Sequence, residues 1–373
     1  MEHWKKRGFV LSLAGIIAAA SLSGCKAESV DNDEAVVMVG DEEVSYGVAN
    51  FYARLVQSRY EDYYMHLTGS VPSEFWEQNF LGEIYEESVK SELVENLQNM
   101  YLIRQHAEEY DVVLTEEEQK AIQEAAADFE EDNALEAKEL VSGYQKYIEE
   151  FLALSTIQEK MDPLMREGVD EEVSDEEAAQ KSMKYVFFSY TKEDGDSDEE
   201  LSDDEKEELK ETAEKFAEKL KDSKKKDIDA AAKKADLDVE TVTFDSESMQ
   251  PNADLIEAAD KLEENEVTDV IEADEGLYVG VVTSLLDREA TDEKKESIIE
   301  ERRSEQYDSL IEKWRGETEI MVNRELWDGI DFANYGITDK DSQDDSDASE
   351  QDSGTSDGAS GSEDPEPEDD AED

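Results

Sequence analysis

The chain has 373 residues, with 104 acidic against 36 basic side chains, a formal net charge of −68 at pH 7 and one cysteine. So much negative charge repels phosphate backbones and anionic headgroups, which argues against nucleic-acid binding and against membrane contact through the protein surface. A single cysteine forms no intramolecular disulfide, so stability has to come from packing. The length leaves room for two domains.

The first 25 residues have the pattern of a bacterial lipoprotein signal. Three basic residues at positions 5–7 precede an apolar run over residues 9–20, and two small residues stand directly before Cys25. The run is short for a stable membrane span. We therefore expect residues 1–24 to be removed and Cys25 to carry the lipid that anchors the mature chain on the extracytoplasmic face of the cell membrane. An ordinary signal peptide, or a buried thiol, is the alternative.

Two polar segments flank the part of the chain that can fold. Residues 25–34 are predicted to be a tether. From Asp339 to the end there are 16 acidic residues and one lysine, so residues 338–373 are predicted to be a disordered acidic tail. The tail could bind cations loosely or act as an electrostatic spacer in a cell wall. The alternative is a solvated end without a function of its own, because carboxylates without regular spacing form no defined site.

Helical patterns dominate the first half of the chain. An apolar strand is predicted at residues 35–39, and Ser45 is a suitable N-cap for a helix through Tyr63. Thr115 and Ser174 are each followed three residues later by glutamate, which predicts two more helix starts with capping boxes. The other helices expected here cover about residues 81–110, 134–150 and 152–166.

The pattern changes after Met183. Residues 184–190 are rich in aromatic and β-branched side chains and predict a strand. An acidic linker over residues 194–204 precedes a charged helix from about 205 to 221. The elements expected after it are a helix at 228–235, a strand at 239–244, a helix at 255–262, and closing strands at 267–271 and 277–282 joined by a turn at 274–276.

Several segments, in this order, resemble one protein family. Residues 37–45 are similar to the opening strand and turn of the PrsA-type foldases and SurA-type periplasmic chaperones, and residues 87–93 to their long helix. Residues 258–268 and 275–282 are similar to the last part of the parvulin peptidyl-prolyl isomerase domain that these proteins carry. A helix from Thr291 to about Glu317 then returns to the first domain, as in the family.

The resemblance implies an α+β fold in which a mainly helical SurA-like chaperone domain carries an inserted small parvulin-like α/β domain. It divides the chain into a helical domain at 35–180, a parvulin-like domain at 182–286 and a C-terminal helical part at 288–336. We expect the first and last of these to fold together, because the late helix carries an apolar face that would otherwise be exposed.

The sequence departs from the family at the residues that matter for catalysis. Parvulins resemble one another in having histidines on the first and last strands, and here those positions are Tyr185 and Tyr278. As candidate catalytic residues, the tyrosines either keep the hydrogen-bond network of the histidines or only pack the core. A desolvated pocket can still lower the barrier to rotation, about 18–20 kcal/mol, without proton transfer. The candidates for an apolar prolyl pocket are Phe187, Met249 and Leu255.

No cofactor and no metal are expected. His66 and His106 lie in predicted helices and lack the clustered carboxylates or cysteines of a metal site. There is no phosphate-binding loop and no Ser-His-Asp order, and the long amphipathic helices argue against a solute-binding lipoprotein.

The resemblance implies an extracytoplasmic, lipid-anchored foldase whose partners are unfolded or newly exported proteins, with a divergent prolyl isomerase (rotamase) domain. Whether this domain is an enzyme stays open, and a non-catalytic holdase or a cell-envelope assembly adaptor is the alternative. A helical cleft could hold clients by apolar contact, although the same side chains could be core. The aromatic candidates for this cleft are Tyr52, Tyr60, Tyr64, Phe75 and Trp76.

Overall fold

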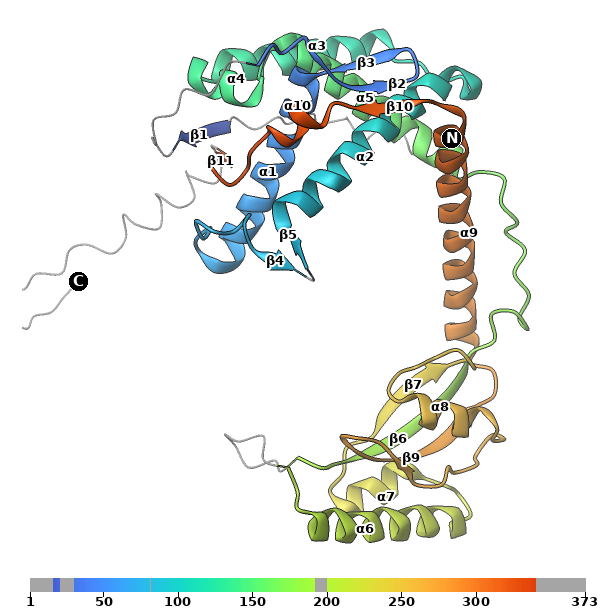
Figure 1. Cartoon of the computed structure of the whole chain (residues 1–373). Coiled ribbons are helices and arrows are strands. Elements are labelled where there is room, and N and C mark those ends of the chain that lie inside the picture. Colours follow the sequence, from blue (N-terminus) through green and yellow to red (C-terminus); the bar gives the residue numbers. More distant parts are fainter. Residues whose placement is uncertain (1–15, 21–29, 81, 192–199, 340–373) are drawn as a thin grey trace, which may run out of the picture. The chain divides into compact units, whose positions relative to one another are not determined.

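The chain forms two compact units (Figure 1). Unit 1 consists of Met1–Met165 and Asp308–Asp373, and unit 2 of Arg166–Tyr307, so unit 2 is inserted between the two parts of unit 1. The α9 helix, Arg288–Glu317, crosses the second boundary. Cys25 and residues 340–373 lie outside the described residues, whereas Thr338 and Asp339, predicted to begin the disordered tail, belong to strand β11 (Tyr335–Asp339). The computed structural model describes residues 16–20, 30–80, 82–191 and 200–339.

Unit 1 is mainly helical, and α5 contacts three of its other helices, α1, α2 and α3. The α1 helix begins where the Ser45 side chain accepts a hydrogen bond from the Val48 amide, and α3 begins at Thr115 with a complete capping box, both as predicted. The helices of this unit that precede α9 are α1 (Tyr46–Thr68), α2 (Tyr85–His106), the 3-10 turn Ala107–Tyr110, α3 (Glu116–Asp132), α4 (Leu135–Val141) and α5 (Gln145–Met165).

A three-stranded sheet joins the two parts of unit 1. Its order is β10-β2-β3, and all neighbours are antiparallel. The central strand β2 (Ala35–Val39) is followed in the chain by β3 (Glu42–Ser45), whereas β10 (Ile320–Val322) comes from the C-terminal part. The smaller elements of the unit are β1 (Ile16–Ala20) paired with β11 (Tyr335–Asp339), the hairpin of β4 (Asn79–Phe80) and β5 (Glu83–Ile84), and α10 (Arg324–Asp328).

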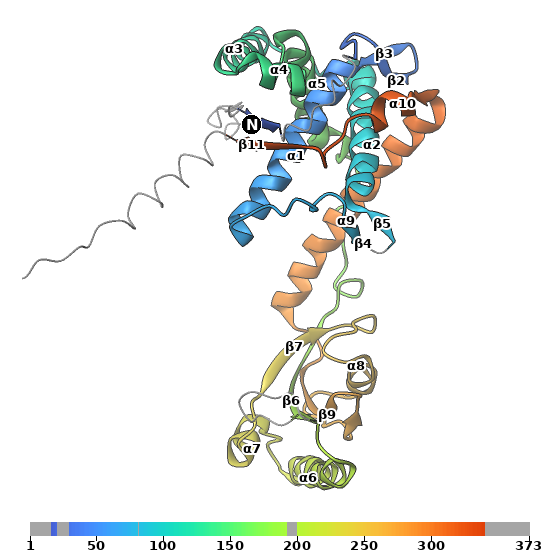
Figure 2. The same cartoon turned by 60° about the vertical axis from the view of Figure 1, so that its left-hand side comes forward.

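Unit 2 has a four-stranded antiparallel sheet of order β7-β6-β9-β8 with helices on both faces (Figures 1 and 2). Because side chains alternate along a strand, β6 contributes Val186 and Phe188 to one core and Met183 and Tyr185 to the other. The first core is covered by α6 and α7, and the second by α8. The elements are β6 (Lys181–Ser189), α6 (Asp203–Asp222), α7 (Ile228–Ala235), β7 (Glu240–Phe244), α8 (Ala253–Asp260), β8 (Ile271–Glu272) and β9 (Gly276–Ser284).

The prediction of a mainly helical α+β fold is confirmed, but two helix predictions are wrong. The break expected near residue 151 lies at Ser142, which has a left-handed backbone (φ 53°) and ends α4. Gly143 follows it, and a Cβ there would lie 2.8 Å from the Phe129 ring, so the close approach of α3 requires glycine.

Ser174 starts no helix. Its hydroxyl does accept the Glu177 amide at 3.1 Å, but the chain makes only one turn there. The acidic side chains of this segment pair with the first half of α9, because Asp175 binds Arg288 and Lys295 and Glu177 binds Arg302. The segment is therefore linked to α9 by exposed side-chain ion pairs and does not continue as a helix.

Among the helices that the structure describes, none is long and apolar enough to cross a membrane.

Candidate functional site

The predicted tyrosine pair lies on one face of the unit 2 sheet. In the β6–β9 register Phe187 is opposite Tyr278, and Tyr185 is opposite Gly280. The ring centroids of Tyr185 and Tyr278 are 5.9 Å apart, and those of Phe187 and Tyr278 are 4.6 Å apart. Three of the predicted site residues therefore form one aromatic group.

Both tyrosine hydroxyls bind carboxylates. Tyr185 donates to Glu240 of β7, and Tyr278 donates to Glu275 at 3.1 Å. Burial, and then the hydrogen bond to Glu240, raises the pKa of Tyr185; burial and the bond to Glu275 raise the pKa of Tyr278 to about 12. Both phenols are neutral at physiological pH and can donate only one proton each, which their carboxylate partners already accept.

The predicted prolyl pocket is brought together only in part. Leu255, at the start of α8, is fully buried and packs in the same core as Tyr185 and Tyr278, with Phe187 half-buried at its edge. Met249 is 67% exposed and is not part of this core. The catalytic role of the tyrosines and the pocket role of the other residues remain predictions.

The raised pKa of Tyr278 predicts the pH at which its phenol loses a proton. Since the folded chain holds this proton more tightly than the unfolded chain, the stabilisation from Tyr278 is complete below pH 10 and is lost as the pH rises towards about 12. The difference in absorbance at 295 nm between the wild type and Tyr278→Phe should therefore have its midpoint near 12. A midpoint at the ordinary tyrosine value of 10 would show that the hydroxyl is not held as described.

A second candidate site is an aromatic pocket in unit 1. A cavity of about 640 Å³ lies between the C-terminal half of α1 and the β4–β5 hairpin. Two of its side chains are widely exposed, Tyr63 at 66% and Phe80 at 55%, so the pocket is open to solvent. We call it the aromatic pocket; its lining residues are Tyr60, Tyr63, Tyr64, Phe75, Gln78, Phe80, Glu83, Tyr85 and Ser88.

Five of the rings that line this pocket, all except Tyr63, contact one another in a continuous set. The centroids of Tyr64 and Phe75 are 4.7 Å apart, and those of Phe80 and Tyr85 are 5.4 Å apart. Trp76 stacks on Tyr85 at 5.4 Å with an angle of 15° between the ring planes. Such contacts stabilise the rings beyond the burial of their area and keep the pocket formed without a ligand.

A buried polar group supports the pocket from below. The Trp76 indole donates to Glu61 of α1 at 2.8 Å, and the same carboxylate oxygen accepts from the Gln57 amide at 2.7 Å. Trp76 is only 4% exposed. The indole is therefore fixed both by stacking and by a hydrogen bond, and rotating it away from the pocket would break its bond to the buried Glu61 carboxylate.

The structure brings together three of the five aromatic residues predicted for a client cleft. Tyr60, Tyr64 and Phe75 line the aromatic pocket, and Trp76 packs beside it. Tyr52 lies elsewhere on α1 and stacks on Phe151 of α5 at 5.3 Å.

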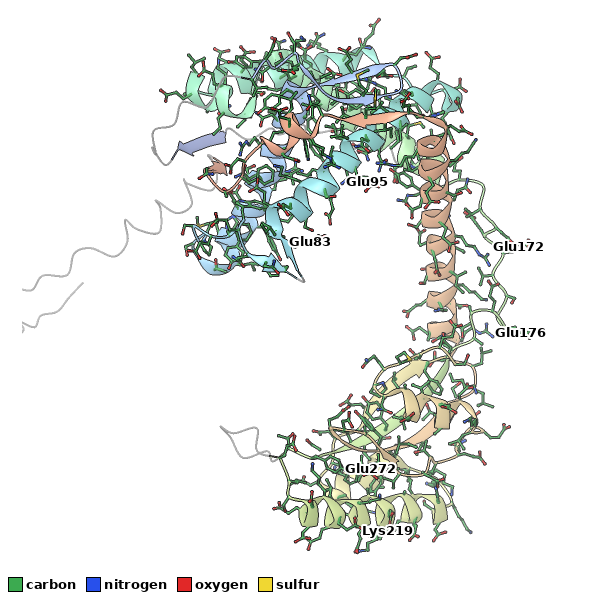
Figure 3. The ribbon with its side chains drawn as sticks, in the orientation of Figure 1. Glu83, Glu95, Glu172, Glu176, Lys219 and Glu272 are labelled. Carbon is green, nitrogen blue, oxygen red and sulfur yellow. The ribbon has the colours of Figure 1, made fainter. Side chains whose placement is uncertain are left out.

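Sequence reasoning missed Tyr63, Phe80 and Tyr85. The spacing of Tyr60, Tyr63 and Tyr64 on one helix was a usable signal for the first, because residues three and four apart share a helix face. Phe80 lies in β4 and Tyr85 directly follows β5, and this short hairpin has no readable strand pattern in the sequence. Glu83, labelled in Figure 3, adds a carboxylate to the same wall.

Neither His66 nor His106 lies in a candidate site. The His106 ring stacks on Trp314 of α9 at 4.2 Å and bonds Glu109 at 2.7 Å, and His66 is exposed on α1. Within the described ranges, no group of three or more histidine, cysteine, aspartate or glutamate side chains has the arrangement of a metal site.

Comparison with known proteins finds similar solved structures. PrsA foldase from Streptococcus pneumoniae is 17% identical, with a TM-score of 0.27, covering 67% of this chain and 96% of that one. PrsA from Lactococcus lactis is 12% identical, with a TM-score of 0.31, covering 80% and 99%. One of two related SurA-like chaperones from Campylobacter jejuni is 12% identical, with a TM-score of 0.26, covering 78% and 99%.

These solved structures are of the foldase and chaperone types that the sequence resembles. No protein-family model matches the chain, and no curated protein matches it. What this chain does therefore has to follow from its own side chains.

Proposed function

We propose that this chain is an extracytoplasmic folding chaperone that binds unfolded, newly exported proteins in the aromatic pocket of unit 1. The observation that carries the proposal is an open cavity of about 640 Å³ whose wall is largely aromatic and whose rim exposes Tyr63 and Phe80. Exposed apolar surface of this kind marks a binding site, and aromatic rings bind apolar segments without demanding one sequence. The strong negative charge of the chain favours basic clients.

The test is suppression of aggregation of an unfolded basic client. Replacing the two exposed rim residues with serine (Tyr63→Ser, Phe80→Ser) removes ring area at little cost to the fold, because both lie mostly in water. We expect about tenfold more of this variant to be needed for the same suppression. Leu67→Ser is the matched control, because Leu67 is 65% exposed on the same helix and does not line the pocket.

Wild-type suppression by the double variant would contradict the proposal. So would equal loss in the Leu67→Ser control, since this would mean that any exposed apolar residue of α1 suffices. We expect Tyr185→Phe with Tyr278→Phe to suppress aggregation like the wild type, because the tyrosine pair lies in unit 2.

A holdase with little isomerase activity is the second candidate, and one observation favours it. Both tyrosine hydroxyls are already bound to carboxylates, and Leu255, the centre of the predicted prolyl pocket, is completely buried. We therefore expect the full chain to isomerise a prolyl peptide slowly compared with histidine-bearing parvulins. Brisk isomerisation that is lost in the tyrosine double variant would assign a catalytic site instead.

The lipid anchor is part of the proposal and depends on Cys25. We expect Cys25→Ser to leave the precursor uncleaved and to release misprocessed chain from the membrane, because a lipoprotein peptidase acts after the thiol is acylated. Acyl mass on the mature N-terminus, measured by mass spectrometry, checks this. A Cys25→Ser protein that still carries acyl mass would show that the anchor is elsewhere.

A further inference from the structure

A groove in unit 2 lies on the sheet face opposite the tyrosine pair. It is a cavity of about 790 Å³ between α6 and α7. The buried side chains of Phe188, Phe216 and Leu220 form its floor, and Leu209 and Leu237 are half-buried at its sides. This floor is continuous with the apolar core that α6 and α7 form with the sheet.

The rim of the groove is basic. Five lysines line it, and the one acidic lining residue, Asp227, is used to cap α7, where its carboxylate accepts the Ala230 amide at 2.9 Å. Long lysine side chains extend an apolar wall with their methylene groups and present the ammonium group at its edge. The lysines are Lys215, Lys219, Lys224, Lys225 and Lys234.

Four of these lysines have no ion-pair partner in the described part of the chain, although it is crowded with carboxylates. The four are Lys219, labelled on α6 in Figure 3, Lys224, Lys225 and Lys234, whereas Lys215 pairs with Glu211 at 2.9 Å. Other lysines of unit 2 are paired, such as Lys184 with Asp229 at 2.7 Å. Residues 219–234 contain seven lysines and three aspartates, a local net charge of +4 in a chain of net charge −68.

We propose that this basic groove binds an acidic peptide segment of another polypeptide, one that also carries apolar side chains. The apolar side chains would lie over Phe216 and between the half-buried Leu209 and Leu237, and the carboxylates would pair with the unpaired lysines at the rim. A cavity of this size is in the range that encloses a few side chains of a bound ligand. The groove thus selects clients of the charge opposite to those favoured by the aromatic pocket, and it does not depend on that pocket.

Two other occupants fit the chemistry less well. The chain's own tail, residues 340–373, carries 15 acidic residues but no aromatic residue and no leucine, isoleucine, valine or methionine. It could neutralise the rim, but it has nothing to place on the floor. Nucleic acids and anionic membranes carry a negative charge at every phosphate, denser than that of a peptide whose acidic residues alternate with apolar ones, so the net charge of −68 repels them more strongly.

The test uses the full chain and a labelled peptide made of leucine, phenylalanine, glutamate and aspartate, with binding followed by fluorescence anisotropy. The variant Lys219→Gln, Lys224→Gln, Lys234→Gln removes three rim charges from exposed positions. We expect its dissociation constant to rise about tenfold. Binding should also weaken with salt, because the screening length falls from about 10 Å at 0.1 M to about 3 Å at 1 M.

The control changes the net charge equally away from the groove. Lys120→Gln, Lys233→Gln and Lys261→Gln remove three exposed charges, and Lys233 lies on α7 itself without lining the groove. We expect wild-type affinity for this variant.

Two control peptides test what the groove recognises: one has serine in place of the leucines and phenylalanines, and one has lysine in place of the acidic residues. Both should bind poorly.

Each alternative has its own signature. Equal binding by the two lysine variants, or no binding of the acidic peptide, overturns the proposal. If the serine peptide binds as tightly as the acidic apolar peptide, the groove recognises charge alone, which also contradicts the proposal. Peptide affinity that rises about tenfold on deleting residues 340–373 assigns the groove to the tail, and a dimer broken by the rim substitutions assigns it to a second copy of the chain.

Discussion

Truncating the chain after Glu317 should unfold unit 1. The truncation removes β10, which pairs with the central strand β2, and it removes three large side chains that are almost completely buried, Trp327, Ile330 and Phe332. Loss of one such side chain costs roughly 2–5 kcal/mol. The three together approach or exceed the roughly 5–15 kcal/mol by which a typical domain is stable.

Tryptophan fluorescence can follow this loss in unit 1 alone. The four tryptophans are Trp4, Trp76, Trp314 and Trp327, so unit 2 contains none. In the truncated chain, emission from Trp76 and Trp314 should shift to the red and lose its cooperative urea transition. Truncation after Asp339, which removes only residues 340–373, is the control and should leave the transition unchanged. A native-like transition in the shorter chain would mean that the N-terminal part folds alone.

The second large effect is expected for Arg54→Met. Arg54 of α1 is 3% exposed, and its Nη1 donates to Gln57 at 2.7 Å and to the carbonyl oxygen of Asp331 at 2.8 Å. Burial lowers the pKa of this guanidinium, while nearby acidic groups, including Asp331 and Glu86, oppose the shift. The guanidinium also lies over the Phe332 ring, 5.6 Å from its centroid. It therefore ties α1 directly to the C-terminal segment.

Methionine fills a similar volume without the charge, so the variant leaves buried acceptors without their donor. Each buried acceptor left without a donor typically costs about 1–3 kcal/mol, so the two together are expected to cost a few kcal/mol. The free energy of unfolding from urea titration, followed by tryptophan fluorescence, measures the loss. Arg59→Met, at an exposed position of the same helix, is the control and should change stability by less than about 0.5 kcal/mol. A loss below about 1 kcal/mol for Arg54→Met would show that the arginine is not needed to hold the segment.

The elements of unit 2 were largely readable from the sequence, because their signals are local. The aromatic and β-branched run at residues 184–190 lies in β6 up to Ser189, and the predicted helix at 228–235 is α7. Strand alternation places Tyr185, Phe187 and Tyr278 on one face of the sheet. The helix α8, which carries Leu255, covers that face. Met249 could not be placed in the same way, because it precedes the helix in a loop whose path no periodicity fixes.

The features that could not be predicted from the sequence depend on contacts between residues far apart in the chain. The segment after Ser174 has a good helix start, yet ion pairs with α9, more than a hundred residues later, determine its path. Arg54 looks like one more surface charge until the carbonyl of Asp331 is placed beside it. The lysines at 219–234 likewise read as a solvated charged face, and only the packing of α6 and α7 shows the apolar floor beneath them.

The insertion of unit 2 between the two parts of unit 1 also sets an order in time. In the export proposed above, the chain emerges from the membrane N-terminus first, so all of unit 2, Arg166–Tyr307, emerges before Asp308 and can complete its sheet first. Until then, the helices at the start of unit 1 expose the apolar surface that Trp327, Ile330 and Phe332 later cover. Until its last residues arrive, a newly made copy therefore leaves this apolar surface of unit 1 open to proteases.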